Sequence, residues 1–390
     1  MNTTFDAVIV GAGLVGASLA LALERARLKI AVVEPQMLRP LPADDGWDVR
    51  VYAVSPGNAM FLETCGVWPR LPRERLSRIE EMRVYGDQPG SRLQFSAYDA
   101  GLRELAFIIE NRLLQHALWE RLNQAAHVSV FCPARCARIA WEADSVVLGL
   151  EDGTELKAKL LVGADGADSW VRREAGIATT PVAYGELGVV ANFNATKRHH
   201  GIAYQWFRRD GVLALLPMPG DRVSMVWSTS EQHGKELVAL APEALAARVV
   251  DASQSALGSL SVICAPVAFP LQLQRVRQFV RPRLALVGDA AHNVHPLAGQ
   301  GVNLGFRDAR ELASVLCERG AETDCGDYHL LRRYERARRE DVLALQLTTD
   351  GLHKLFAHEN AWLVRARNLG LSGVDALPPL KKLLLRRAVA

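Results

Sequence analysis

The sequence lacks the features that would place the chain in a membrane, outside the cell or on nucleic acid. No uninterrupted apolar run reaches the length needed to cross a bilayer. The amino terminus has no basic segment ahead of an apolar one, so we expect no signal peptide and a cytoplasmic location. The formal net charge is only +3 and no basic run is interleaved with aromatic residues, which predicts no nucleic-acid partner. With 390 residues, 49% hydrophobic and 23% charged, the composition is that of a globular protein with two domains or one divided domain.

Cysteine and histidine are few and poorly placed for metal or redox chemistry. The six cysteines include no C-x-x-C, which favours free thiols, and Cys132 and Cys136 are expected to be structural. His292 and His295 have H-x-x-H spacing but no third ligand beside them, so we predict no metal site. The pair at 199–200 lies in a polar turn and is expected to be solvated.

Residues 5–34 have the pattern of a nucleotide-binding βαβ unit. A buried apolar strand leads into a G-x-G-x-x-G turn, an Ala- and Leu-rich helix follows, and a second apolar strand ends at Glu34. Gly11 permits the tight turn, Gly13 lets the backbone approach a pyrophosphate, and Gly16 lets helix and strand pack closely. At the end of the second strand, Glu34 can accept hydrogen bonds from ribose hydroxyls. Because strands, helix and acid accompany the glycines, the pattern predicts a dinucleotide site.

A second segment of this kind occupies residues 284–305. A short apolar strand ends in Gly288-Asp289, and a glycine-rich turn then leads into a predicted helix. This arrangement places one carboxylate at a strand tip and unpaired amides at a helix N-terminus, which suits a negatively polarised group. Together with the first segment, it predicts a flavin dinucleotide held at both ends.

Three motifs follow one another along the chain: G-x-G-x-x-G, then Gly163-Ala-Asp165-Gly166, then Gly288-Asp289. In this order they resemble the single-component flavoprotein aromatic hydroxylases of the p-hydroxybenzoate hydroxylase fold. The run from Gly288 to Asp308 is similar to the signature of the UbiH/VisC branch, the hydroxylases of ubiquinone biosynthesis. Segments within 50–55, 206–228 and 367–371 match that branch too, so the likeness covers nearly the whole chain.

The resemblance implies FAD as the bound cofactor and NAD(P)H as the co-substrate. It places the FAD pyrophosphate on Gly11, Gly13 and Gly16 and the adenosine ribose on Glu34. It implies no catalytic nucleophile, because the flavin carries out the bond-making steps while the protein supplies placement, polarity and exclusion of water.

Other parts of the cofactor are assigned by the same resemblance. Arg112 is implied at the phosphate–ribitol region, and Asp289 at the ribitol or pyrophosphate side. Asp165 lies in a segment linked to both FAD and NAD(P)H binding. The residues implied in the cofactor site near the isoalloxazine are Arg50, Pro296, Gly299, Gln300, Gly301, Val302 and Asn303.

The order of segments predicts an α/β fold in which a Rossmann-like FAD-binding domain is interrupted by an antiparallel β-sheet domain. The aromatic and β-branched runs separated by turns predict the sheet. A helical C-terminal region follows, in which the alternating charges at 332–341 predict a solvated helix face. The predicted FAD-binding domain comprises 1–75, 100–182 and 276–320, the substrate-binding sheet 76–99 and 183–275, and the helical region 321–390.

The resemblance implies an FAD-dependent monooxygenase that uses NAD(P)H and O2 to hydroxylate the ring of a prenylated phenol. Only one G-x-G-x-x-G is present, so the nicotinamide is expected to visit without a second dinucleotide domain. Alternatives are a prenyl reductase of the same fold, and a non-catalytic flavoprotein subunit of a ubiquinone-biosynthesis complex. A flavin halogenase is disfavoured, because its W-x-W-x-I-P pattern is missing.

Two further features concern the substrate and its surroundings. The aromatic and aliphatic side chains of the predicted sheet are either a substrate wall or ordinary core, and core is favoured. They are Trp206, Leu215, Met225 and Trp227. The basic, leucine-rich segment 380–387 predicts either docking on the protein itself, which is favoured, or peripheral contact with the inner face of a membrane.

Overall fold

The strands that carry the nucleotide-type turns lie together in one sheet. β1 (Thr3–Val10) runs parallel to β2 (Ile30–Val33) on one side and to β11 (Glu155–Gly163) on the other. β8 (Val128–Phe131) pairs with β2, and β18 (Leu284–Leu286) pairs with β11, again in parallel. The predicted βαβ unit is therefore confirmed at the amino terminus. The computed structural model describes residues 3–42, 46–88, 90–293, 301–320 and 322–357, with 367, 368, 373, 381 and 385.

Antiparallel strands extend this sheet on the β11 side. β17 (Val280–Arg281) pairs with β18, β10 (Val146–Leu150) with β11, and β9 (Cys136–Trp141) with β10. The turn at Asp152-Gly153 joins β10 to β11. The sheet thus combines a parallel centre, which brings the nucleotide-type turns to one edge, with antiparallel flanks.

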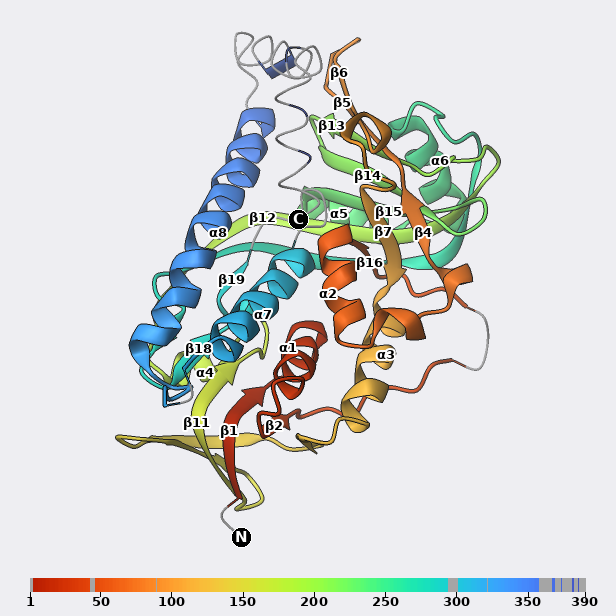
Figure 1. The fold of residues 1–390 in the computed structure, drawn as a ribbon. Coiled ribbons are helices and arrows are strands. Elements are labelled where there is room, and N and C mark those ends of the chain that lie inside the picture. The colour runs from red at the N-terminus through yellow and green to blue at the C-terminus, as the bar shows by residue number, and fades with distance from the viewer. Residues whose placement is uncertain are drawn as a thin grey trace.

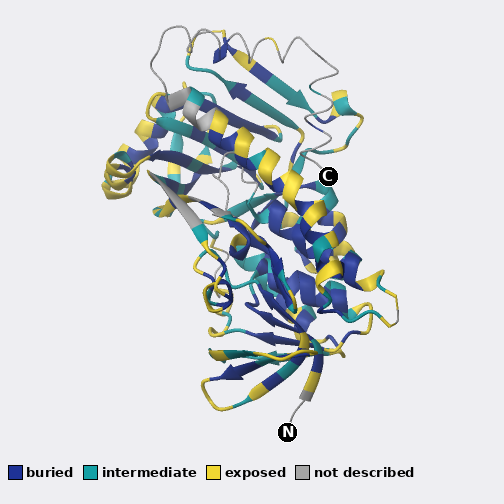
Figure 2. Cartoon of the chain, turned by 90° about the vertical axis from the view of Figure 1, so that its left-hand side faces the viewer, coloured by how far each residue is buried: buried dark blue, intermediate teal, exposed yellow. Residues whose placement is uncertain are grey.

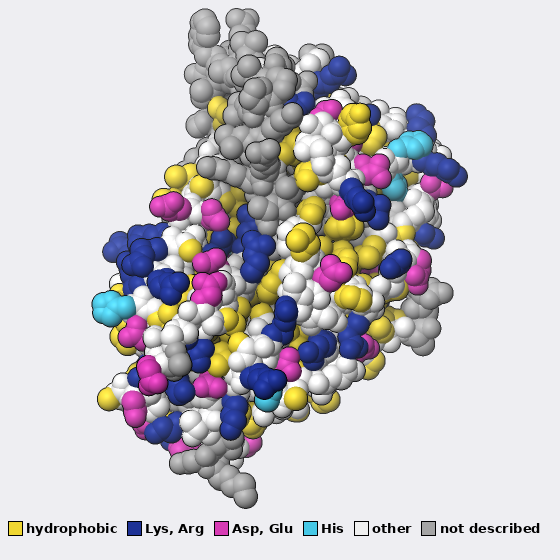
Figure 3. Space-filling view, in the orientation of Figure 1, with side chains coloured by type: hydrophobic (Ala, Val, Ile, Leu, Met, Phe, Trp, Pro, Cys, Tyr) yellow, Lys and Arg dark blue, Asp and Glu magenta, His cyan; other side chains and the backbone are white. Residues whose placement is uncertain are grey.

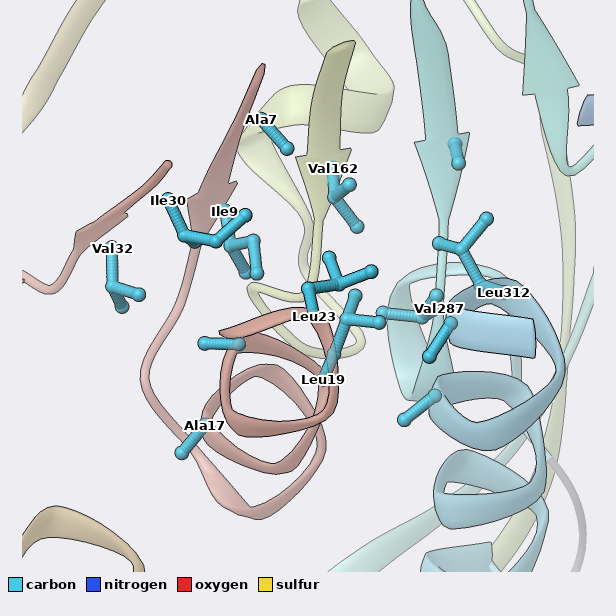
Figure 4. Packing of buried hydrophobic residues seen from close by; sticks show 14 of the residues in the cluster. Ala7, Ile9, Ala17, Leu19, Leu23, Ile30, Val32, Val162, Val287 and Leu312 are labelled. Carbon is cyan, nitrogen blue, oxygen red and sulfur yellow. The ribbon is translucent and has the colours of Figure 1, made fainter. Parts of the chain in front are cut away.

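Helices cover the parallel strands and form the main core with them. They are α1 (Leu14–Glu24), α3 (Asn111–Asn123) and α7 (Gly301–Cys317) (Figure 1). Figure 4 shows Ile9, Val162 and Val287 of the sheet side pointing toward Leu19 of α1 and Leu312 of α7. All five are no more than 1% exposed, so the sheet and the two helices pack as one rigid support.

A second sheet is formed mainly by the middle of the chain, as predicted. Its strand order in the described residues is β19-β16-β12-β15-β14-β13-β5-β6. The neighbours are antiparallel except β13 and β5, which are parallel. β5 comes from the amino-terminal part of the chain and no hairpin joins it to β13, so a parallel pairing is possible. The strands are β5 (Glu81–Tyr85), β6 (Arg92–Ser96), β12 (Thr179–Ala195), β13 (Ile202–Arg208), β14 (Gly211–Met218), β15 (Arg222–Ser230), β16 (Leu260–Val276) and β19 (His292–Asn293).

Two helices cover one face of this sheet and decide what its aromatic residues do. α5 (Glu231–Ala239) and α6 (Pro242–Ala252) supply Leu237 and Leu245 to a core cluster with the sheet. The four candidate wall residues belong to this cluster and are at most 3% exposed. The core interpretation is therefore right, and the substrate-wall alternative is wrong, because these side chains face the helices. They are Trp206, Leu215, Met225 and Trp227.

A small third sheet joins the two larger ones. Its central strand β7 (Ala106–Glu110) pairs with β3 (Val51–Val54) and β4 (Ser77–Ile79). Ile108 of β7 packs with Ala203 of β13 and Met218 of β14. The domain limits stay a prediction. The remaining elements are α2 (Pro56–Thr64), α4 (Trp170–Glu174), η1 (Trp68–Arg70), η2 (Arg73–Arg75), η3 (Tyr98–Ala100) and η4 (Gly288–Ala290).

The long helix α8 (Tyr328–Ala357) runs along the side of the molecule (Figure 1). The prediction that 332–341 is a solvated face is wrong for three of these ten residues. Tyr334, Glu335 and Arg338 are at most 4% exposed, because this side of α8 packs against β17 and α7, while exposed residues form its outer side (Figure 2). Sign alternation alone could not distinguish these sides.

The histidine pair in the turn after β12 also differs from expectation. His199 is buried, and its Nε2 lies 2.8 Å from the carbonyl oxygens of both Met218 and Gly220. Its Nδ1 accepts a hydrogen bond from the Gly201 amide at 3.1 Å. The prediction of a solvated residue is wrong for His199, because the turn folds back on the β14–β15 connection, whereas His200 is exposed.

Candidate cofactor-binding and active site

The glycine turn after β1 has an open side and a crowded side. A Cβ at Gly16 would lie 2.0 Å from the carbonyl oxygen of Gly11, so only glycine permits this contact between helix and turn. A Cβ at Gly13 would meet no atom within 4 Å. Gly13 is also the N-cap of α1 and supplies no side-chain cap. The turn therefore presents free space next to a helix N-terminus, which is the geometry that binds a pyrophosphate.

Glu34 is held beside that turn at the end of β2. Its Oε2 accepts the Ala12 amide at 2.8 Å and its Oε1 accepts the Gln36 amide at 3.1 Å. A carboxylate has more acceptor positions than these two bonds use. Glu34 is thus fixed in place and still able to accept hydrogen bonds from ribose hydroxyls.

Arg112 lies at the start of α3 in a cluster of acids. Its amide donates to Asp48 Oδ2 at 3.0 Å, and its Nη2 contacts Gly46 and Glu110. Its Nε is buried and has no partner among the residues that the structure describes. A buried, unpaired guanidinium N–H favours a further acceptor, and a phosphate–ribitol oxygen fits this requirement.

Asp165 uses its carboxylate inside the protein. Oδ1 accepts the Ser169 hydroxyl at 2.5 Å and Oδ2 accepts the Val171 amide at 3.0 Å, so Asp165 shapes the turn before α4. Arg172 of α4 then donates to the Ala290 carbonyl at 2.9 Å. The side chain of Asp165 therefore orders its own turn and α4, and Arg172 of α4 joins this turn to the Gly288-Asp289 turn.

Asp289 shares its surroundings with Arg50 and Tyr52 of one segment and with Phe269 of another. The Arg50 guanidinium lies 5.4 Å from the Tyr52 ring centre and 5.3 Å from that of Phe269. Burial raises the pKa of Tyr52, and the negative charge of Asp289 adds to this effect. Asp289 is exposed, yet the protein around it displaces enough water that burial raises the pKa of its carboxyl, against the charges of His292 and Arg50.

The cluster of Arg50, Tyr52, Phe269 and Asp289 also has an apolar side. Phe269 and Val267 are 37% and 38% exposed, and both lie on the face of β16 that Arg50 contacts. Figure 3 shows hydrophobic side chains gathered near α2 and the second sheet. Exposed apolar side chains beside a cation and a phenol suit a ring that carries a hydrophobic substituent.

The start of α7 uses one predicted site residue as a structural anchor. The side chain of Asn303 accepts the Ser55 amide and the Asn58 Nδ2, each at 2.9 Å, and donates to the Ala53 carbonyl at 2.7 Å. Its amide group is thus engaged by β3 and α2. Gly301 and Val302, which precede it, are half-buried. The predicted residues Pro296, Gly299 and Gln300, like His295, lie outside the described residues.

The geometry therefore meets the requirements of FAD at several points. Open space over Gly13 and the unpaired Nε of Arg112 are the two observations that carry the fit. Tyr52 and Phe269 were not predicted as site residues. Tyr52 lies in a segment that the sequence did single out, whereas no local signal marks Phe269, because its neighbour Arg50 is more than two hundred positions away.

Comparison with known proteins agrees with this geometry. Residues 4–347 match the family model described as FAD binding domain. The chain is 36% identical over 385 residues to the ubiquinone hydroxylase UbiL of Rhodospirillum rubrum, covering 98% of this chain and 89% of that protein. It is 33% identical over 389 residues to the 3-demethoxyubiquinol 3-hydroxylase of Escherichia coli K12, covering 100% and 99%.

A solved structure extends the agreement to the fold. The probable FAD-dependent monooxygenase PqsL of Pseudomonas aeruginosa superposes with a TM-score of 0.78 at 25% identity, covering 95% of this chain and 100% of that one. Fold and site together define a flavin-dependent monooxygenase of the p-hydroxybenzoate hydroxylase fold. The chain belongs to the FAD binding domain family, in the branch that contains the ubiquinone-biosynthesis hydroxylases. It is an FAD-dependent enzyme that uses NAD(P)H as co-substrate, as is usual in this family.

Proposed function

We propose that this enzyme hydroxylates the aromatic ring of a prenylated phenol on the route to ubiquinone. The observation that carries the proposal is the full-length similarity to two hydroxylases named for ubiquinone or its precursor. The exposed Phe269 and Val267 beside Arg50 support it, because they offer an apolar surface next to polar groups that can orient a phenol.

The protein's own residues bind and orient the reactants. FAD, reduced by NAD(P)H, supplies the oxygen-activating chemistry when it is bound. Gly13 and the N-terminus of α1 would hold its pyrophosphate, Glu34 its adenosine ribose, and Arg112 and Asp289 the part between pyrophosphate and ring. The N-terminus of α7, which begins at Gly301, would stabilise negative charge on the reduced ring system.

The surroundings of the enzyme are part of the proposal as well. Among the described residues, no helix is long and apolar enough to cross a bilayer. Of the segment 380–387, the structure describes Lys381 and Leu385, and Leu385 is 6% exposed. Burial of a leucine there supports docking on the protein itself over membrane contact. Contact with an anionic membrane surface, and membership in a ubiquinone-biosynthesis complex, stay predictions; binding of purified protein to anionic vesicles at low salt tests the first.

Product analysis of the purified yellow protein tests the proposed reaction. NAD(P)H oxidation is measured with and without a prenylphenol, and the products are identified by mass spectrometry. Substrate-stimulated oxidation with a product heavier by one oxygen supports the proposal. Reduction of prenyl double bonds indicates a prenyl reductase, and bound FAD without turnover indicates a non-catalytic subunit. The precursor that accumulates in a deletion strain then identifies the ring position.

A further inference from the structure

The inner side of α8 holds the strand and turn that lead to Asp289. The Tyr334 hydroxyl donates to the Leu286 carbonyl of β18 at 2.8 Å. The next residue, Glu335, accepts the Phe279 amide at 2.7 Å. These two side chains are at most 1% exposed, so both bonds are made away from water. The strand before the Gly288-Asp289 turn is therefore fastened to a helix that begins forty residues later in the chain.

One turn further along α8, Arg338 reaches the turn itself through Asp308. Arg338 Nε donates to Asp308 Oδ1 at 2.8 Å. Asp308 Oδ2 accepts the Gly288 amide at 2.9 Å and lies 2.6 Å from His292 Nε2. The side chains of His292, Asp308 and Arg338 are at most 5% exposed. A connected set of buried charges thus joins α8, α7 and the residues on both sides of Asp289.

The buried carboxylate of Asp308 depends on the positive charge of Arg338 for its stability. A carboxylate without partners is very unfavourable in a protein interior, and removal of one partner of a buried pair is strongly destabilising. Burial by itself raises the pKa of Asp308, but the charges of His292 and Arg338 together hold it below its ordinary value. Without Arg338, Asp308 would lose charge or move, and the Gly288 amide would lose its acceptor.

We propose that α8 determines how tightly this enzyme holds FAD, with Arg338 and Tyr334 as positioning residues for the Gly288-Asp289 turn. Neither residue touches the glycine turn after β1, and neither belongs to the motifs that predict cofactor binding. They act by keeping β18 and the turn in the conformation that presents Asp289. The inference rests on the proposed role of Asp289 as an FAD ligand.

The first experiment measures FAD dissociation from the purified full-length protein. Dilution of the yellow protein releases FAD, and the rise of flavin fluorescence gives its dissociation constant. In Arg338→Met, which keeps the length of the side chain and removes its charge, we expect FAD to bind at least tenfold more weakly. Arg338→Lys should recover part of the loss, because it restores a cation that can pair with Asp308. Circular dichroism checks that each variant is folded.

Two arginines on the outer side of the same helix provide matched controls. Arg336 and Arg339 are exposed. Arg336→Met and Arg339→Met remove the same charge from the same helix, and their FAD dissociation constants should stay within twofold of the parent protein. A folded Arg338→Met protein that also stays within twofold would overturn the proposal, as would controls that lose FAD equally.

A milder change decides the matter if Arg338→Met does not fold. Tyr334→Phe removes a single hydroxyl, and we expect it to weaken FAD binding about fivefold, in line with the loss of one buried hydrogen bond. Unchanged FAD binding in a folded Tyr334→Phe protein would then overturn the proposal. Asp289→Asn separates the two assumptions: if it binds FAD normally while Arg338→Met does not, the proposed role of Asp289 fails and α8 acts on FAD by another route.

Discussion

Asn58 and Asn303 are joined side chain to side chain at 2.9 Å, although 245 positions separate them in the sequence. The same Asn58 nitrogen also donates to the main-chain oxygen of Asn303 at 3.2 Å, and both residues are at most 1% exposed. This contact connects α2, which follows the segment of Arg50, to the first turn of α7. Two parts of the candidate site are therefore held at a fixed spacing by one amide pair.

Replacement of Asn303 is expected to destabilise the fold. In Asn303→Leu, the Ser55 amide, the Ala53 carbonyl and Asn58 Nδ2 would lose buried partners. We expect the free energy of unfolding to fall by about 3 kcal/mol, measured by urea denaturation. The exposed Asn123 provides the control, since Asn123→Leu should change it by less than about 0.5 kcal/mol. Equal stability of Asn303→Leu and the parent protein would contradict the anchoring role.

Replacement of Gly13 and of Gly16 by alanine should have different effects on thermal stability. A Cβ at Gly13 meets no protein atom, so Gly13→Ala should keep the melting temperature of the FAD-free protein and lower FAD affinity. A Cβ at Gly16 would lie 2.0 Å from the Gly11 oxygen. Gly16→Ala should therefore lower both the melting temperature and the FAD affinity. Thermal unfolding with and without FAD distinguishes them. If Gly13→Ala binds FAD normally, the pyrophosphate does not lie over that residue.

Phe269 is expected to contribute to substrate binding but little to FAD binding. Removal of its ring in Phe269→Ala takes away apolar contact worth about 1.5–3 kcal/mol, so KM for a prenylated phenol should rise at least about tenfold. The FAD content, read from the visible spectrum, should stay unchanged. Tyr98, an aromatic residue that is 89% exposed, serves as the control in Tyr98→Ala. A raised KM in the control, or an unchanged one in Phe269→Ala, would argue against this role.

Burial should protect Cys65 from thiol reagents. Burial raises the pKa of the Cys65 thiol to about 11, so almost no thiolate exists at pH 8. Cys317 is exposed. We expect Ellman's reagent to react with Cys317 in the fastest phase, and with Cys65 only after unfolding in guanidinium chloride. Loss of the fast phase in Cys317→Ser, but not in Cys65→Ser, is the expected pattern, and the reverse would show that Cys65 is accessible.

Asp308 should make the stability of the fold depend on acid pH. Despite its burial, the charges of His292 and Arg338 hold its folded pKa below the unfolded value of about 3.9. Its carboxylate therefore stabilises the protein above about pH 4, and this contribution is lost as the pH falls through the lower folded pKa. Asp308→Asn should unfold more easily at pH 7 and show a weaker dependence below pH 4, measured by urea denaturation. The exposed Asp99→Asn should keep the parent profile.

Much of the cofactor-binding side of the fold could be predicted from the sequence, because its signals are local. The strand, glycine turn and helix from β1 to α1 depend on residues next to one another, and the observed elements follow them closely. The antiparallel strands β13, β14 and β15 could also be predicted, since turn residues separate runs of apolar and aromatic ones. The parallel pairing of β5 with β13 could not be predicted, because nothing local specifies which strand β5 meets.

The candidate site, like the fold, has features that follow from local sequence and features that follow only from tertiary contacts. The sequence alone determined that glycine must occupy positions 11 and 16, and that the acids Glu34 and Asp289 follow strands, because turn geometry and strand length are local properties. Only the tertiary structure decided that Arg338 is buried against Asp308, that Asn303 serves as an anchor, and that Phe269 faces Arg50. Those relationships depend on which surfaces the sheets and helices bring together, and a charge or ring on one element carries no local mark of its distant partner.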